Sequence, residues 1–401
     1  MPTPVYLDNN ATTRCDQAVV DAMLPFFTEQ FGNPSSMHAF GASVGGAVKA
    51  ARAQLQTLLG AEFDHEIVFT AGGTESDNMA ILSALESQVG RDEIITSAVE
   101  HPAVLSLCAH LEKTRGVKVH VIPVDEKGLL DIAAYRAALS EKTAIVSFMW
   151  ANNETGTIFP VVELAEMAKE VGALFHTDAV QAVGKIPIDL KSTMIDMLSL
   201  SGHKLHGPKG IGALYVRRGV RFRSLIKGGH QERGRRAGTE NTPGIVGLGK
   251  AAELAAAHME DENTRVAALR DRLEKGLLQR IPNAFVTGNP SERLPNTSNI
   301  AFEYVEGEGI LLLMNREGVA ASSGSACTSG SLEPSHVLRA MKVPYTAAHG
   351  AIRFSFSRDN TDADVDRVLE VMPAIIEKLR AMSPFWQGAG QAPATFNPVY
   401  A

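Results

Sequence analysis

The sequence predicts an α/β protein, with a large domain built on a mainly parallel sheet and a smaller α+β domain toward the C-terminal end. The first observation is a recurring unit in which a short apolar run, a small polar cluster and a helical stretch follow one another. Such alternation is typical of βαβ units and therefore of parallel strands. The second observation is the length of 401 residues, which exceeds what a single compact core usually accommodates.

The elements follow in a consistent order along the first part of the chain. Helical periodicity is present over residues 16–30 and 40–59. The recurring units come next, and each one places polar side chains directly after a strand. Because ligands bind outside the carboxyl ends of parallel strands, we expect these side chains to converge on one crevice. The five units cover residues 66–78, 93–102, 143–156, 173–181 and 196–204.

The second part of the chain begins with a long helical stretch rich in Ala and Leu, which we expect over residues 244–281. The second domain then contains expected strands at 284–288, 298–305 and 351–357 and expected helices at 309–318 and 362–382. The tail is rich in Pro, Gly and Ala, a composition typical of loose chain ends. We divide the chain into an N-terminal segment packing with the small domain (1–15), a large domain (16–260), a small domain (261–382) and a tail (383–401).

Composition and charge favour a cytoplasmic enzyme. Apolar residues make up 45% of the chain, charged residues 21%, and the net charge of −7 excludes a general attraction to nucleic acid or anionic membranes. Cys15, Cys108 and Cys327 are an odd number with scattered spacing, which argues against a disulfide framework and for a reducing compartment. We find neither a signal peptide nor an apolar run of the roughly 18 residues that a spanning helix needs.

Lys204 follows an apolar strand in the motif SGHK, so we expect its side chain at the rim of the sheet beside Ser201 and His203. An amine in that place can attack an aldehyde as a nucleophile. Taken alone, this residue is better interpreted as a surface lysine in a turn.

Asp178 lies at the end of a strand in LFHTD. A carboxylate that enters an apolar crevice needs a cationic partner, and a protonated pyridine nitrogen would serve. Taken alone, Asp178 is better interpreted as a helix N-cap before AVQA.

The motif TAGGTESDN supplies two glycines and Thr74 at the start of a helix. Backbone amides and the helix dipole bind phosphate well at such a place, although Thr74 and Asp77 also fit an ordinary capping box. His101 precedes Pro102 and could stack on an aromatic cofactor or move protons, or it could simply satisfy a backbone group. The four features together describe a pyridoxal-phosphate site, because that cofactor needs a Schiff-base lysine, a partner for its ring nitrogen and a phosphate pocket.

Cys327 lies among small residues in SSGSACTSG, bracketed by Gly324 and Gly330. Structural cysteines usually pack among apolar neighbours, whereas this loop offers little packing. An exposed free thiol carries an oxidation risk, so we interpret Cys327 as a reactive thiol rather than an incidental one in a tight turn. Cys108, in a helical apolar pattern, is expected in the core.

Other site types have weaker support. His203 and His206 are three residues apart, but no second pair has zinc-like spacing, so we expect no metal. The basic runs at 217–223 and 233–236 are short, and a solvated or dimer-facing role suits them better than nucleic-acid binding.

At these residues the sequence resembles the class V aminotransferase family of fold-type I pyridoxal-phosphate enzymes, and within it the group I cysteine desulfurases of the nitrogen-fixation type. The resemblance covers nearly the whole chain before the tail and implies a large domain with a seven-stranded sheet. The motifs that carry it are YLDNNATT (6–13), GNPSSMH (32–38), TAGGTESDN, EHPAV, NNETG, HTDAVQ, SGHKLHGPKGIGALY, GGHQERGRRAGTEN (228–241), SSGSACTSG and IRFSFSRDNT (352–361).

The resemblance implies a role for each matching residue at the cofactor. Lys204 would carry pyridoxal 5'-phosphate and shuttle a proton, Asp178 would keep the pyridine nitrogen protonated, and His101 would stack over the ring. Gln181 would hydrogen-bond the phenolic oxygen. The phosphate would be held by Gly73, Thr74, Ser201 and His203, and by Thr239 of the neighbouring subunit, which implies a homodimer.

The resemblance also implies how the substrate is bound and used. Arg353 and Asn153 would fix the carboxylate of L-cysteine, while Asn33, Asn9 and Ala11 would line the entrance. Cys327 would take the substrate sulfur as a persulfide, leaving L-alanine, and would pass the sulfur to an acceptor protein such as an iron–sulfur scaffold. Supply of sulfur to nitrogenase and general housekeeping supply both stay open.

Two alternatives from other classes remain. One is a related pyridoxal-phosphate enzyme, such as a selenocysteine lyase or a class V aminotransferase, although transamination has no need of Cys327. The other is a non-catalytic sulfur-relay scaffold, against which an intact Lys204 argues.

Overall fold

The computed structural model describes residues 4–323, 334–386 and 388. Cys327 and most of the tail that begins at residue 383 lie outside the described residues. In the described part of the chain, no helix is both long and apolar enough to cross a membrane.

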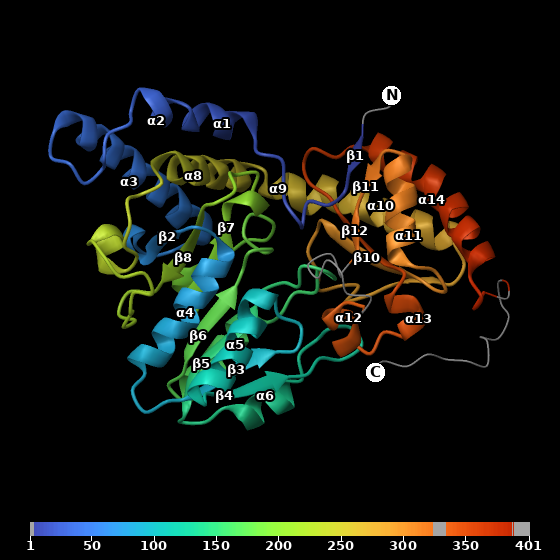
Figure 1. Cartoon of the computed structure of the whole chain (residues 1–401), viewed down its shortest axis with the longest axis horizontal. Helices are drawn as coiled ribbons and strands as arrows, with labels where there is room; N and C mark the ends of the chain where they lie inside the picture. The colour runs from blue at the N-terminus through green and yellow to red at the C-terminus, as the bar shows by residue number, and fades with distance from the viewer. Residues whose placement is uncertain (1–3, 324–333, 387, 389–401) are drawn as a thin grey trace.

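A seven-stranded sheet forms the centre of the larger part of the molecule (Figure 1). Its strand order is β2-β8-β7-β6-β5-β3-β4, and only β8 runs antiparallel to its neighbours. The predicted α/β fold class with a mainly parallel sheet is therefore confirmed. The strands are β2 (Ile67–Thr70), β3 (Glu93–Ser97), β4 (Lys118–Ile122), β5 (Thr143–Met149), β6 (Leu174–Asp178), β7 (Met197–Ser201) and β8 (Gly212–Val216).

Helices cover both faces of this sheet because its strands are apolar on both sides. In β2, Ile67 and Phe69 belong to one buried cluster and Val68 to another, as the twofold alternation of a strand requires. Helices α4 and α5 cover the face of Val68, and α3, α7 and α8 contribute to the other cluster. The helices of this part are α1 (Gln17–Met23), α2 (Pro25–Thr28), α3 (Ala39–Leu59), α4 (Gly73–Ser87), α5 (Pro102–Arg115), α6 (Ile132–Ala138), α7 (Val161–Glu170) and α8 (Thr242–Ala257).

A second, four-stranded sheet lies in the C-terminal part, with the antiparallel order β12-β13-β10-β9. The N-terminal strand β1 pairs in parallel with β11 and lies beside these C-terminal elements (Figure 1). The strands are β1 (Val5–Tyr6), β9 (Ala284–Val286), β10 (Thr297–Phe302), β11 (Val319–Ala320), β12 (Ser322–Ser323) and β13 (Ala351–Ser355). The helices are α9 (Met259–Asp261), α10 (Ala267–Arg280), α11 (Gly307–Arg316), α12 (His336–Ala340), α13 (Tyr345–Ala348) and α14 (Asp362–Met382).

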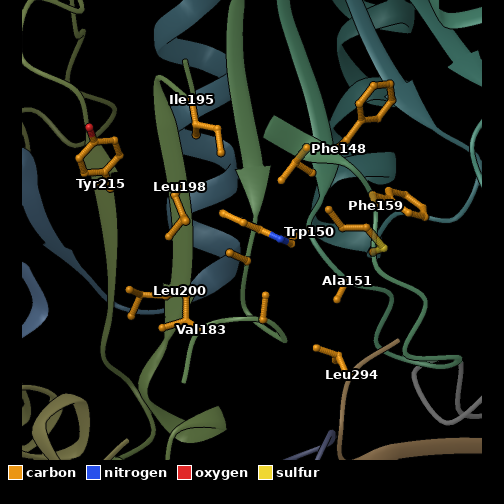
Figure 2. Close-up of a cluster of buried hydrophobic side chains, with 14 of the residues drawn as sticks. Phe148, Trp150, Ala151, Phe159, Val183, Ile195, Leu198, Leu200, Tyr215 and Leu294 are labelled. Carbon is orange, nitrogen blue, oxygen red and sulfur yellow. The ribbon is translucent and has the colours of Figure 1, made fainter. Parts of the chain in front are cut away.

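The largest buried cluster reaches from the sheet to the segment that leads into the second sheet. Figure 2 shows Phe148 of β5, Leu198 and Leu200 of β7 and Leu294 of the later segment in this cluster. Phe148 and Leu294 are both completely buried. Burial of this kind is the main favourable term in folding, and here it supports the strand ends from which functional side chains emerge.

Two expected helices are interrupted. The helix expected over 16–30 is divided into α1 and α2, because Pro25 has no N–H for the helical ladder and starts a new helix instead. The helix expected over 244–281 is divided at His258 and again by a π-helical turn (Glu262–Val266). Within that turn the Nδ2 of Asn263 donates to the backbone oxygens of Met259 and Lys185, both at 2.8 Å, so a side chain competes for the helical carbonyl of Met259.

Candidate active site

A cavity of about 360 Å³ lies at the carboxyl ends of β2, β3, β5, β6 and β7. This volume is in the range of small-molecule sites. All five predicted polar clusters reach it, and side chains from the N-terminal segment and the second sheet close it. The predicted residues that line it are Ala11, Gly73, Thr74, His101, Asn153, Asp178, Gln181, Ser201, His203, Lys204 and Arg353.

Asp178 is the last residue of β6, and only 8% of its surface is exposed. Its Oδ1 accepts a hydrogen bond from the backbone N–H of Val180 at 2.9 Å, and a turn rather than a helix follows. The N-cap interpretation is therefore wrong, although the carboxylate does bind a nearby N–H. Burial raises the pKa of Asp178, while the Val180 N–H, His101 and Lys204 act to lower it.

Two further buried carboxyl groups lie near Asp178. Burial and the proximity of Asp178 raise the pKa of Asp77 well above its usual value. Burial likewise raises the pKa of Glu100 to about 8, although the Ser97 hydroxyl (2.6 Å) and the Met149 N–H (3.0 Å) both bind its Oε1. Among the described residues, Asp77 Oδ1 and Glu100 Oε2 have no hydrogen-bond partner. A cationic ligand group at this end of the cavity would favour the ionised form of Asp178 and act against the effect of burial on its pKa.

His101 is the N-cap of α5, and it also lines the cavity. Its Nδ1 accepts from the backbone N–H of Ala103 at 3.1 Å, so the ring proton of the neutral imidazole must be on Nε2. Burial lowers the pKa of His101, which keeps the ring neutral. Satisfying a backbone group and facing the cavity are therefore compatible functions of this residue.

An anion cradle occupies another side of the cavity, at the N-terminus of α4. The helix starts at Gly73 with Gly72 as its N-cap, so Thr74 lies in the first turn and the predicted Thr74–Asp77 capping box does not form. The first N–H groups of a helix have no acceptor within it and can bind an anion. A Cβ at residue 73 would lie 2.8 Å from Val180 Cγ2, which explains the glycine.

Ser201 ends β7, His203 follows it, and both line the cavity close to this cradle. Burial, together with the neighbouring positive charges of Lys204 and Lys209, lowers the pKa of His203 to about 4. The imidazole is therefore neutral, and its Nδ1 lies 3.2 Å from the Thr12 hydroxyl.

Lys204 ends the short turn Gly202–Lys204 after β7, and its amine points to the N-terminal segment. Nζ donates to the backbone oxygens of Asn10 and of Ala11, the latter at 2.6 Å. Lys204 and Asp178 line the same cavity, and the positive charge of Lys204 acts to lower the pKa of Asp178.

Gln181 is held from two sides. Its Nε2 donates to the backbone oxygen of Asn10 at 3.0 Å, and its Oε1 accepts from Lys185 Nζ at 3.0 Å. Lys185 is 6% exposed, and burial lowers its pKa to about 7. The Gln181 amide therefore has a fixed position at the wall of the cavity.

Arg353 lies in the middle of β13, and its guanidinium faces the cavity. One terminal nitrogen donates to Asp8 Oδ1 at 2.9 Å, and the other donates to the backbone oxygen of Asn153 at 3.0 Å. Its Nε is buried without a hydrogen-bond partner among the described residues. The group is thus oriented and able to bind a carboxylate.

Three predicted site residues that the structure describes do not line this cavity. Asn33 and Thr239 are exposed elsewhere, and Asn9 lines a smaller neighbouring cavity with Lys185. Cys327 lies outside the described residues, but Ser322 and Ser323 of β12, a few residues before it, line the cavity.

Sequence reasoning missed several residues of the site. Asp8 and Asn10 lie in the motif YLDNNATT, beside Ala11 and Asn9, which were singled out. Their polar side chains directly follow a short apolar run, and this pattern could have indicated that they belong to the site. Asp77 was interpreted as a helix cap, and Lys185 was not considered because it lies four residues beyond the strand-end cluster.

Comparisons with known proteins agree with this geometry. Residues 5–368 match the model of the family described as aminotransferase class-V. The chain is 78% identical over 397 residues to a cysteine desulfurase of Gluconacetobacter diazotrophicus, with 99% of each chain covered. It is 64% identical over 399 residues to the cysteine desulfurase NifS of Azotobacter vinelandii, again with 99% of each covered. A solved structure titled NifS-like protein superposes with a TM-score of 0.88 at 38% identity, covering 94% of this chain and all of the other.

Proposed function

This chain belongs to the class V aminotransferase family, and on that basis we propose that it is a cysteine desulfurase that uses pyridoxal 5'-phosphate. The observation that carries the proposal is the single cavity in which Lys204, Asp178 and the α4 cradle meet. We further propose that it acts in the cytoplasm and delivers sulfur for iron–sulfur cluster assembly, including clusters for nitrogenase, by its similarity to NifS.

The residues of the cavity fit the cofactor. A buried carboxyl group with a raised pKa suits a protonated pyridine nitrogen, because that cation would stabilise the carboxylate of Asp178. The glycine at residue 73, where a Cβ would collide with Val180, leaves the first turn of α4 open to a phosphate. Lys204 would hold the aldehyde carbon, and the neutral ring of His101 would lie over the pyridine face.

Bound pyridoxal phosphate supplies an electron sink for the charge that develops at the substrate α-carbon. The Arg353 guanidinium, oriented by Asp8 and Asn153 O, binds the carboxylate of L-cysteine. The Lys204 amine removes the α-proton and returns a proton to the same region. Asp178 holds the proton of the ring nitrogen.

The Cys327 thiolate then attacks the substrate sulfur. The carbon–sulfur bond of cysteine breaks, a sulfur–sulfur bond forms, and the former substrate carbon takes up a proton to give alanine. The substrate carbon is reduced while the two sulfur atoms are oxidised to a persulfide, so no external oxidant is needed. The persulfide is then available to an acceptor protein.

We also propose that the enzyme is a homodimer in which Thr239 completes the phosphate site of the partner. Thr239 is exposed and lies outside its own cavity. The segment 24–40, near the loop that carries Thr239, exposes large apolar side chains that a monomer would leave in water. These side chains are Leu24, Phe27, Phe31, Met37 and Phe40, each 55% exposed or more.

The proposed function is tested by incubating the protein with L-cysteine and measuring alanine together with sulfane sulfur on the protein. We expect the two products in equal amounts in a first turnover. Cys327→Ala should keep the visible absorbance of the bound cofactor and lose sulfane sulfur, with Cys108→Ala as the matched control that keeps both. Full activity of Cys327→Ala, or transamination in place of sulfur release, would refute the persulfide mechanism.

The dimer proposal is tested by mixing Lys204→Ala and Thr239→Ala subunits. A mixed dimer contains one site with both Lys204 and a partner Thr239, so we expect more activity than either parent gives. No gain on mixing, with subunit exchange shown by mass spectrometry, would contradict the proposal.

A further inference from the structure

Lys185 is a buried lysine that takes no part in the reaction steps proposed for this site. It lies one helical turn's spacing after Gln181, and its Nζ is 3.0 Å from Gln181 Oε1 and 3.4 Å from Asn10 Oδ1. Gln181 is also buried and lines the main cavity, whereas Lys185 does not. Lys185 therefore contacts a residue of the cavity wall without lining the cavity itself.

The chemistry of these groups fixes which way the Gln181 amide points. An ammonium group only donates hydrogen bonds, so the atom of Gln181 that faces it must be the oxygen. The amide nitrogen then lies on the other side, where one of its hydrogens is used by the backbone oxygen of Asn10 at 3.0 Å. The second hydrogen remains for a ligand in the cavity.

The charged groups around Lys185 have opposing effects on its pKa, which lies at about 7, and the protonated amine has three N–H donors for Gln181 and its other neighbours. Glu262, from the start of the π-helical turn, faces it and acts to raise its pKa, while burial, Lys204 and Arg353 act to lower it. Lys185 and Glu262 both line a small cavity of about 20 Å³, which is large enough for one water molecule. Glu262 Oε2 has no hydrogen-bond partner among the described residues, so such a water would have a donor and an acceptor to bind.

We propose that Lys185 is a positioning residue that holds the Gln181 oxygen and thereby aims the Gln181 N–H at the phenolic oxygen of the bound cofactor. The inference rests on the proposed function, because it needs pyridoxal phosphate in the cavity. Without Lys185 the amide could turn over and present its oxygen, which repels the phenolic oxygen instead of binding it.

The test follows the visible absorbance of the cofactor-loaded enzyme, without substrate, as a function of pH. The absorbance changes as the bound cofactor loses the proton next to its phenolic oxygen. A hydrogen bond donated to that oxygen stabilises the deprotonated form and so lowers the midpoint of this titration. Lys185→Met should therefore raise the midpoint of this titration by about 0.5–1 pH unit, which is one hydrogen bond expressed as a pKa shift. Lys185→Arg keeps donors near Gln181 and should retain the wild-type midpoint.

A double-variant cycle separates positioning from a simple charge effect. On the background of Gln181→Leu, which has no amide to orient, Lys185→Met should leave the midpoint unchanged. Equal shifts on both backgrounds would mean that the charge of Lys185 acts directly through space, and this would overturn the proposal. A wild-type midpoint in Lys185→Met would overturn it as well.

Two further variants serve as controls. Lys185→Met removes one of the cations that lower the pKa of the buried Glu262, so the double variant Lys185→Met/Glu262→Gln provides a protein without that carboxylate, and the same midpoint shift is expected. Lys169→Met is the matched control, because Lys169 pairs with a buried carboxylate, Asp196, but lies outside the cavity. If the wild-type protein binds no pyridoxal phosphate, the proposed function fails; if it binds and Lys185→Met titrates normally, only this inference fails.

Discussion

The two sheets supply functional side chains in different ways. The seven-stranded sheet presents residues at or just beyond its strand ends, and Asp178 is held there by Val180, two residues away. The four-stranded sheet presents Arg353 from the middle of β13, and its guanidinium is held by Asp8, 345 residues away in the chain, and by the backbone oxygen of Asn153. The strand-end carboxylate is therefore held by a local hydrogen bond, whereas the arginine on the strand face depends on a distant segment, as the Lys204 amine does through Ala11 O.

Removing the amine at the end of β7 should have the largest effect. Lys204→Ala should abolish both alanine formation and the cofactor attachment that borohydride makes permanent, because this residue alone would hold the aldehyde carbon. Protein mass after borohydride treatment measures the attachment. Lys191→Ala, which changes an exposed lysine of the same part of the chain, should behave as wild type. Persistent attachment in Lys204→Ala would place the reactive amine elsewhere.

Asp178→Asn should have the next largest effect. The amide cannot hold the proton of the ring nitrogen by charge, so we expect kcat to fall about 100- to 1000-fold, the usual loss for one preorganised electrostatic contact. Cofactor should still bind, because the α4 cradle is unchanged. Steady-state kinetics and the visible absorbance measure the two quantities. A fall of only a few-fold would show that Asp77 or Glu100 can replace this carboxylate.

Changes on the strand face should act mainly on substrate binding. Arg353→Lys replaces a planar fork by a point charge, and we expect KM for cysteine to rise about 10- to 100-fold with a smaller change in kcat. Asp8→Asn keeps a hydrogen-bond acceptor for Arg353 and should raise KM less. If Asp8→Asn raised KM more than Arg353→Lys, the orientation that Asp8 gives to residue 353 would contribute more to substrate binding than the guanidinium group itself.

The smallest effect on turnover is expected from Glu100→Gln, whose consequence is a change in stability with pH. The folded pKa of Glu100 is about 8 and its ordinary value is 4.5. Between these values the unfolded state is ionised and the folded state is not, so the wild type loses free energy of unfolding as the pH rises from about 4.5 to 8. Glu100→Gln cannot ionise and should lose less over that window, as measured by denaturant unfolding at several pH values.

Glu274, beside the second sheet, provides the opposite case. Burial acts to raise its pKa, but hydrogen bonds from Arg293 (2.6 and 2.8 Å) and Ser298 (2.7 Å) outweigh burial and lower it. The stability it contributes is present above pH 4.5 and is lost as the pH falls through the lowered pKa. Glu274→Gln should therefore be less stable than wild type at neutral pH, and the difference should vanish in acid. Slopes of the same sign for Glu100 and Glu274 would contradict the contrast between the two regions.

The same contrast explains how much could be predicted from the sequence. The strand-end clusters were recognisable because an apolar run followed by polar residues is a local pattern, and those clusters do meet in one cavity. The pairing of Asp8 with Arg353 and of Lys185 with Gln181 was not recognisable, because neither partner has a pattern of its own. Boundaries of long helices were also predicted wrongly, as where the side chain of Asn263 binds the helical carbonyl of Met259. The action of Thr239 across subunits and the role of Cys327 stay predictions.

The strand β1 has a consequence for how the enzyme is made. Its partner β11 and the guanidinium that Asp8 binds lie more than 300 residues later in the chain, so β1 leaves the ribosome well before them. At about 5–20 residues per second, the N-terminal strand waits roughly 17–70 s for these partners. The seven-stranded sheet can form during that interval. A nascent or truncated polypeptide can therefore form the strand ends that line the cavity while it still lacks Arg353, the residue proposed to bind the substrate carboxylate.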